Sequence, residues 1–280
     1  MKNIFIIGDS TTSECTKEEY PQQGWAHYLR EEFCDDVNII NCGHAGNSLK
    51  SFLYSNGAAS GTTNESEWDG ILSQINSGDS VIFYWAGIND MLQTCADRYI
   101  EFPGGEYVRD FQNTSCESYI KIGKGLGTHK FFTYTSTIDE YKEMFTGMLE
   151  DIKKKGACVI AASGTGKYYK IGGDDKNVIS VVREYTHAVR DAAAAAGAAF
   201  IDVGTEFERE FLEIGYDEML KKYFLSKEAY AYYSTVGEVT RKVPAVDDNV
   251  HYNLEGARHV CKIFVDKLRT SGHELSKYLK

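Results

Sequence analysis

The sequence predicts an α/β fold built on a doubly wound parallel sheet, and two observations support this class. First, short apolar runs rich in β-branched residues recur along the chain with little polar alternation, as expected for strands buried on both faces. Second, segments with helical periodicity separate most of these runs, which is the pattern of βαβ units. The five predicted strands are residues 4–7, 37–40, 81–85, 159–162 and 200–203.

Four further segments place apolar side chains at helical spacing. The segment 139–155 aligns Tyr141 and Phe145 on one side and ends in Lys-Lys-Lys-Gly, a favourable helix C-terminus. Another ends in an alanine run followed by Gly197, which is also typical of a helix end. The four predicted helices are residues 24–33, 139–155, 178–196 and 254–268.

The stretch 93–137 interrupts this alternation, because it is rich in glycine and tyrosine and has no clear period. A loop of this length within a compact domain is usually functional. We interpret it as an irregular insertion over the edge of the sheet. Since no repeat or linker divides the chain, we expect a single domain that spans residues 1–280.

Charge and composition limit the partners of the chain. Of its 280 residues, 42% are hydrophobic, which is enough for a sizeable core. There are 30 Lys and Arg residues against 41 Asp and Glu, a net charge of −11. Such a charge disfavours nucleic acid and anionic membrane surfaces as partners. In addition, no apolar stretch approaches the length needed to span a bilayer.

The seven cysteines are scattered, odd in number, and without a Cys-x-x-Cys pair. This arrangement favours free thiols in a reducing compartment over disulfides or a zinc site. The apolar run at residues 4–7 is too short for the core of a secretory signal. We therefore expect a cytoplasmic protein, while a secreted protein whose signal peptide had been removed would show the same sequence.

Candidate site residues are sought directly after each strand, because ligands bind beyond the carboxyl ends of the strands in an open α/β sheet. The first run is followed by Gly8-Asp9-Ser10-Thr11-Thr12. In a strand-to-helix turn, Ser10 could project both its hydroxyl and its backbone N–H into the crevice. Taken alone, capping a helix N-terminus is the commoner role for such a serine.

Two further strand ends offer hydrogen-bond donors. The second run is followed by Asn-Cys-Gly-His-Ala-Gly-Asn-Ser, in which Gly46 presents a backbone N–H that no bulky side chain shields. The third is followed by Gly-Ile-Asn-Asp, and the side-chain amide of Asn89 could face a developing oxyanion. A glycine-permitted turn and a helix cap are the structural alternatives for Gly46 and Asn89.

A serine hydroxyl needs a base to react near neutral pH, and His251 is the best candidate among the seven histidines. It ends the tetrapeptide Asp248-Asn249-Val250-His251. A carboxylate three residues before a histidine can hold the imidazole Nδ1–H and leave Nε2 for the serine, and Asp247 has a less suitable spacing. For this tetrapeptide alone, a capping aspartate beside a surface histidine is at least as common.

Together these residue sets resemble the motifs of the SGNH, or GDSL-type, hydrolases: Ser10 in Gly-Asp-Ser, Gly46, Asn89 in Gly-x-Asn-Asp, and Asp248 with His251 in Asp-x-x-His. The stretches NCGHAGNSLKSF and DDNVHYNLEGA are similar to the rhamnogalacturonan acetylesterase branch. The resemblance covers nearly the whole chain. It implies a flavodoxin-like three-layer α/β/α sandwich without metal or cofactor. It also implies a catalytic set of Ser10, Asp248 and His251, with an oxyanion hole of the Ser10 and Gly46 N–H groups and Asn89.

The same resemblance implies a serine carbohydrate esterase. Its substrate would be an acetylated carbohydrate, of the rhamnogalacturonan, pectin or xylan type, deacetylated through an acetyl-enzyme. Two alternatives stay open: a carbohydrate-binding relative without turnover, and a GDSL-type lipase or thioesterase acting on another acyl ester. The branch usually has histidine in place of Ile88 and often arginine in place of Asn47, and these two departures bear on the identity of the substrate.

Overall fold

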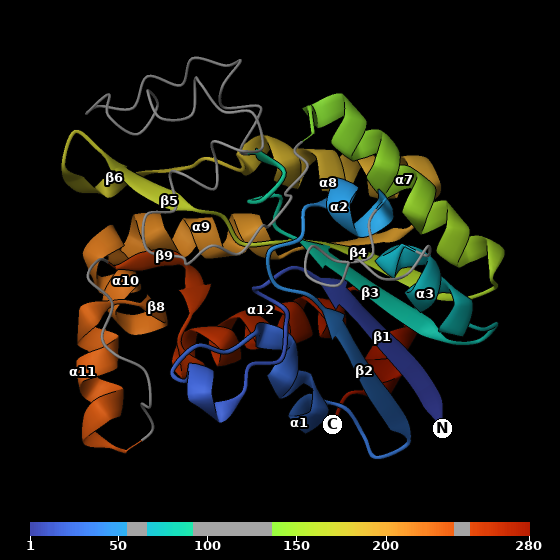
Figure 1. Cartoon of the computed structure of the whole chain (residues 1–280), viewed down its shortest axis with the longest axis horizontal. Coiled ribbons are helices and arrows are strands. Elements are labelled where there is room, and N and C mark those ends of the chain that lie inside the picture. The colour runs from blue at the N-terminus through green and yellow to red at the C-terminus, as the bar shows by residue number, and fades with distance from the viewer. Residues whose placement is uncertain (55–65, 92–135, 238–246) are drawn as a thin grey trace.

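The computed structural model describes residues 1–54, 66–91, 136–237 and 247–280, and its centre is a parallel five-stranded sheet (Figure 1). The strand order is β2-β1-β3-β4-β7. This is the order of flavodoxin-like sheets, in which the chain switches direction between β1 and β3 and leaves a crevice there. The strands are β1 (Lys2–Gly8), β2 (Val37–Gly43), β3 (Ser80–Trp85), β4 (Cys158–Ser163) and β7 (Ala199–Asp202).

The five apolar runs predicted as strands all form strands of this sheet, with one shift at a boundary. Val203, predicted as the last residue of a strand, is the first residue of α9 (Val203–Ile214). The helix begins there because the Asp202 side chain accepts a hydrogen bond from the Thr205 N–H at 3.0 Å, which caps the helix N-terminus.

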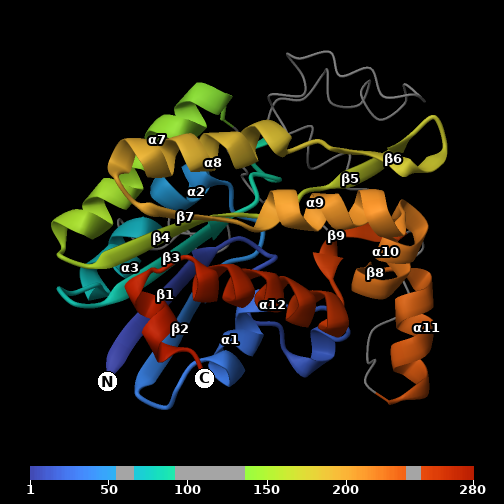
Figure 2. The same cartoon turned by 180° about the vertical axis from the view of Figure 1, so that it is seen from behind.

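Helices cover both faces of the sheet and complete the three layers of an α/β/α sandwich (Figures 1 and 2). Successive strand residues alternate between two cores, so that Phe5 and Ile7 face one layer and Ile4 and Ile6 the other. The first layer contains α2 (Leu49–Tyr54), α3 (Glu67–Gln74), α7 (Ile138–Lys154) and α8 (Arg183–Ala196). The second contains the 3₁₀ helix η2 (Trp25–Tyr28), α1 (Leu29–Glu32), α9 and α12 (Leu254–Thr270).

Three of the four predicted helices are confirmed with small changes in their bounds. The helix α7 follows a capping box of Thr137 and Glu140, whose side chains and N–H groups bond reciprocally. The helix α12 follows the N-cap Asn253, whose side chain accepts from the Gly256 N–H. Residues 24–33 form a short 3₁₀ helix that continues into α1.

The predicted helix at residues 178–196 is wrong over its first three residues, which belong to a strand. The strand β6 (Asp174–Ser180) pairs antiparallel with β5 (Tyr168–Ile171), and α8 begins only at Arg183. The two strands are joined through Gly172 and Gly173, whose φ angles of 62° and 76° suit a tight hairpin turn. Hydrogen bonds to β5 determine the conformation of residues 178–180, and helical periodicity in the sequence does not reveal such bonds.

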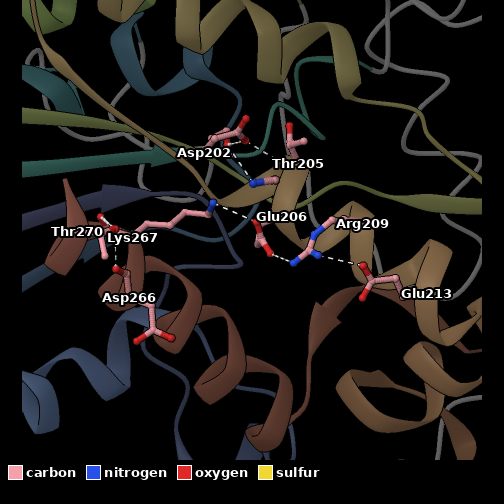
Figure 3. Close-up of polar contacts among 10 residues, drawn as sticks. Asp202, Thr205, Glu206, Arg209, Glu213, Asp266, Lys267 and Thr270 are labelled. Atoms are coloured by element: carbon pink, nitrogen blue, oxygen red, sulfur yellow. Dashed lines mark hydrogen bonds and ion pairs between the residues drawn. The ribbon is translucent and has the colours of Figure 1, made fainter.

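Between α9 and α12, the described residues form α10 (Tyr216–Tyr223), β8 (Phe224–Leu225), α11 (Lys227–Thr235) and β9 (Asp248–Tyr252). The last of these, β9, contains Asp248 and His251. The two short strands pair antiparallel with each other. An ion pair joins the flanking helices, because Lys267 of α12 contacts Glu206 of α9 at 3.1 Å; within α9, Arg209 links Glu206 to Glu213 (Figure 3). The strand β9 itself contacts β8 and α12.

Some expectations fall outside the described residues. The predicted insertion at 93–137 lies almost entirely within residues 92–135, and the single-domain organisation stays a prediction. Cys95 and Cys116 lie there too, whereas the other five cysteines are free thiols. In the part of the chain that the structure describes, no helix combines the length and the apolar character needed to cross a membrane.

Candidate active site

The turn after β1 holds Ser10 at the switch point of the sheet. The preceding Asp9 is buried, and its carboxylate accepts hydrogen bonds from the N–H and the hydroxyl of Thr11 at 2.9 and 2.7 Å. It also accepts from the Ala86 N–H, at 3.4 Å, directly after β3. The Asp9 side chain thus ties the serine turn to the end of the neighbouring strand and leaves Ser10 half-buried at the surface of the crevice.

The simplest alternative for Ser10, a helix N-cap, is wrong. The hydroxyl of Ser13 donates to the Ser10 carbonyl at 3.0 Å and closes a compact turn over residues 9–13. The next helical element is the 3₁₀ helix η1 (Lys17–Glu19), whose N-cap is Thr16. The Ser10 side chain is accordingly available for a contact elsewhere in the molecule.

That contact is with His251, which lies 241 positions away in the sequence. The Nε2 atom of His251 is 2.9 Å from the Ser10 Oγ, and its Nδ1 is 2.7 Å from the Asp248 Oδ2. An ionised carboxylate only accepts hydrogen bonds, so Nδ1 carries the proton and Nε2 offers its lone pair to the serine hydroxyl. The structure thus brings Ser10, His251 and Asp248 into one hydrogen-bonded series, the arrangement that activates a serine for acyl transfer.

Asp248 and His251 lie in the strand β9, not in a turn that leads directly into a helix. The second carboxylate oxygen of Asp248 accepts from the N–H groups of Val250 and His251 at 2.8 and 3.1 Å, which fixes the carboxylate relative to the ring. The expected decoy, Asp247, points elsewhere and accepts from the Lys227 N–H at 2.7 Å. The three-residue spacing of Asp248 and His251 therefore produces the contact within one short strand.

The pKa values of this pair support a base at His251. Burial raises the pKa of Asp248, but the attraction of His251 and the hydrogen bonds outweigh it and lower that pKa to about 2. For His251, burial lowers the pKa, the Asp248 carboxylate raises it, and the balance is a rise. Asp248 is therefore ionised near neutral pH and makes the imidazole a stronger base.

A buried asparagine after β9, which was not among the predicted site residues, anchors the histidine segment. The side-chain amide of Asn253 donates to the carbonyls of Lys222 and Phe224, both at 3.0 Å, while its oxygen caps α12. On the other side of the strand, the Gln23 N–H donates to the Tyr252 carbonyl at 3.2 Å. The pattern Asn-x-x-Gly before an apolar helix was the available signal for Asn253, since it marks an N-cap.

Gly46 lies in the loop of residues 44–48, which joins β2 to α2. Its φ angle is 83°, in the left-handed region that favours glycine, so the position requires this residue for its backbone conformation alone. At the start of the loop, the His44 N–H donates to the Gly8 carbonyl at 2.9 Å, two residues before Ser10. The loop therefore leaves the sheet beside the serine turn.

Asn89 follows β3, and its side chain reaches the same loop. The Nδ2 atom donates at 2.9 Å to the carbonyl of Asn47, which is the residue directly after Gly46. An amide nitrogen carries two protons, so this bond orients the group while using only one of them. The structure thus brings Asn89 and Gly46 together at the strand ends beside Ser10.

The neighbouring Asp90 is fully buried and supports both strand ends. One carboxylate oxygen accepts from the Leu49 N–H at the start of α2 at 2.8 Å, and the other from the Trp85 indole at 3.1 Å. Burial raises the pKa of Asp90 to about 7. These contacts make Asp90 a structural support of the loop that contains Gly46.

No group of three or more His, Cys, Asp or Glu side chains suited to a metal ion occurs among the described residues.

A model of the GDSL-like lipase/acylhydrolase family matches residues 6–259, a span that includes all five predicted site residues. The chain belongs to this family. It is a carboxylic ester hydrolase with the α/β fold of the SGNH hydrolases.

Similar proteins include acetylesterases. Rhamnogalacturonan acetylesterase RhgT of Bacillus subtilis (strain 168) is 20% identical over 276 residues, which are 99% of this chain and 93% of that protein. The solved structure of the Bacillus subtilis protein YXIM matches with a TM-score of 0.62 and 20% identity over 98% of this chain, which spans only 57% of that longer chain. An acetylxylan esterase from Geobacillus stearothermophilus matches with a TM-score of 0.53 and 14% identity, over 98% of this chain and 95% of its own. The structural matches show a shared fold.

Proposed function

We propose that this acylhydrolase is a serine carbohydrate esterase that removes O-acetyl groups from plant polysaccharides or their oligosaccharides. The hydrogen-bonded series from the Ser10 hydroxyl through His251 to Asp248, with contacts of 2.9 and 2.7 Å, carries the chemical part of the proposal. The similarity to a rhamnogalacturonan acetylesterase over 99% of the chain supports the choice of substrate class.

The proposed reaction begins at the Ser10 hydroxyl. The Ser10 Oγ attacks the acetyl carbonyl while His251 Nε2 takes the hydroxyl proton, and Asp248 stabilises the resulting imidazolium. The negative oxygen of the tetrahedral intermediate accepts hydrogen bonds from the N–H groups of Ser10 and Gly46 and from the Asn89 side chain. The intermediate collapses, the sugar oxygen leaves with the proton from His251, and an acetyl-serine remains. Water, deprotonated by His251, then releases acetate and restores the Ser10 hydroxyl.

Replacing Asn89 by alanine is expected to lower kcat roughly 10²- to 10³-fold, because one donor to the developing oxyanion is lost. The KM should change little, since the bond forms mainly in the transition state. Steady-state kinetics with nitrophenyl acetate measure both constants. A kcat for Asn89→Ala equal to that of the parent would remove Asn89 from the oxyanion hole.

The substrate is tested by measuring acetate release from acetylated rhamnogalacturonan and xylan oligosaccharides, together with hydrolysis of acetyl and octanoyl nitrophenyl esters. We expect acetate from at least one glycan and a higher kcat/KM for the acetyl ester. Faster hydrolysis of the octanoyl ester, with no acetate from any glycan, would favour a lipase or thioesterase. If a fluorophosphonate fails to add mass at Ser10, a carbohydrate-binding relative without turnover would be favoured instead.

A further inference from the structure

The loop that contains Gly46 is held from outside by a carboxylate that has no part in the motifs described above. Glu67 is the first residue of α3, and one of its oxygens accepts from the Asn47 side-chain amide at 2.7 Å. Both of its oxygens lie 2.8 Å from Nδ1 of His44. Since the carboxylate only accepts, the ring nitrogen donates, and Glu67 binds two residues that flank Gly46.

Asn47 connects this carboxylate to Asn89. The Asn47 side chain is buried and bonded to Glu67, while its backbone carbonyl accepts the Asn89 amide at 2.9 Å. A shift of Asn47 would therefore change the orientation of the Asn89 amide as well as the backbone beside Gly46. The contacts form a continuous series from α3 to two of the three oxyanion donors.

The carboxylate is itself firmly placed. The next residue, Trp68, is 2% exposed and packs against Phe52 of α2 and Phe83 of β3, with ring centroids 6.2 and 6.3 Å away. The Glu67 side chain is only 20% exposed, against 47% for His44, so its hydrogen bonds form in a partly desolvated site. The pKa of His44 is raised by its hydrogen bond to Glu67, which is consistent with a strong contact.

We propose that Glu67 is a positioning residue of the oxyanion hole, which acts through Asn47 on the orientation of Asn89. This inference rests on the proposed function, because it assumes that Asn89 stabilises the oxyanion. Transition-state stabilisation by fixed donors depends on their placement before the reaction, so a loosened donor loses much of its effect. A purely structural role would instead lower stability and leave the kinetics of the folded enzyme unchanged.

The first test is the kinetics of Glu67→Ala on nitrophenyl acetate. We expect kcat to fall about 10- to 100-fold, as for a donor displaced by a fraction of an ångström, with KM changed by less than about twofold. Glu67→Gln should recover most of the lost kcat, because its carbonyl oxygen can still accept from Asn47. The matched control is Asp69→Asn, which removes a negative charge from the same turn of α3. The exposed Asp69 side chain accepts from the Ser66 hydroxyl at 2.8 Å, which an asparagine oxygen can still do, so this variant should behave as the parent.

The second test is a double-mutant cycle. In an Asn89→Ala background, Glu67→Ala should lower kcat by a clearly smaller factor than in the parent, since one of the two donors that it supports is already gone. Independent, multiplicative losses would overturn the proposed route through Asn89. Asn47→Ala, which keeps the backbone carbonyl but loses the bond to Glu67, should lower kcat in the same direction and serves as a second variant if Glu67→Ala does not fold.

The outcomes separate this inference from the proposed function. Parental kcat in both Glu67→Ala and Asn47→Ala, together with loss of activity in Ser10→Ala, would overturn the role of Glu67 and leave the esterase mechanism standing. Full activity in Ser10→Ala would overturn the mechanism, and the inference with it. Thermal unfolding of each variant shows whether a lower kcat reflects a loss of folded protein.

Discussion

Replacing Ser10 by alanine is expected to lower kcat/KM for acetate release by at least about 10⁴-fold, because the nucleophile of the proposed reaction is lost. The Ser10 Oγ is the atom that lies 2.9 Å from His251 Nε2, and alanine offers no atom there for attack on the carbonyl. The fold should survive, since the turn is held by the side chains of Asp9 and Ser13 and not by the Ser10 hydroxyl. Acetate release and nitrophenyl acetate hydrolysis both measure the effect.

A matched control is Ser73→Ala, which removes a serine hydroxyl from the exposed side of α3, where it bonds only locally to the Gly70 carbonyl. This variant should keep parental kinetics. Mass spectrometry after fluorophosphonate treatment gives an independent readout, with one adduct at Ser10 in the parent and none at this position in Ser10→Ala. Parental acetate release by Ser10→Ala would exclude an acetyl-enzyme at this residue.

Replacing Asp248 by asparagine is expected to lower kcat by roughly 10⁴-fold while it leaves Ser10 in place. The carboxylate accepts the Nδ1 proton of His251 at 2.7 Å and so keeps Nε2 unprotonated toward the serine. An asparagine can present its NH₂ group to Nδ1, which favours the opposite tautomer, with the proton on Nε2. The tautomer of His251 that can take the proton from the serine hydroxyl then becomes a minor form, which leaves only residual activity.

The pH dependence of the residual activity provides a second readout for Asp248→Asn. The base must be unprotonated, so kcat/KM rises with pH through the pKa of His251 in the free enzyme. Burial lowers this pKa and the Asp248 carboxylate raises it, with a net rise in the parent. Without the carboxylate the pKa falls, and the acid limb of the profile should move to lower pH.

The neighbouring Asp247 supplies the control for this prediction. Asp247→Asn removes the same charge one residue earlier, from a side chain that is exposed and bonds to the Lys227 N–H instead of the histidine. Its kcat and acid limb should match those of the parent. An equal loss in the two variants would mean that net charge near the site, and not the contact to Nδ1, governs the base.

The fold could be predicted from the sequence wherever a local pattern and the tertiary structure agree. The five apolar runs become the five strands of the parallel sheet, because a strand covered on both faces needs nearly continuous apolar residues. Residues 178–180 could not be assigned in this way, since their conformation depends on antiparallel pairing with β5. The element β8 is only two residues long and α11 has a weak helical period, so both depend on packing: α11 lies against α10 and β8, and α10 lies against α9 and α12.

The sequence by itself determined the contacts between residues that are close together in the chain. The three-residue spacing of Asp248 and His251 sets their contact, and a glycine at position 46 is what a loop with positive φ requires. Tertiary structure alone decided that Ser10 meets a histidine 241 positions away, that Asn89 bonds to the Asn47 carbonyl, and that Glu67 holds the same loop. The physical reason is that local hydrogen bonds follow from spacing along the backbone, whereas these contacts join segments that are far apart in the chain. The parallel strands β2, β1 and β3 bring the turns of Gly46, Ser10 and Asn89 to one edge of the sheet, and β9, which pairs with β8 outside that sheet, carries His251 to them.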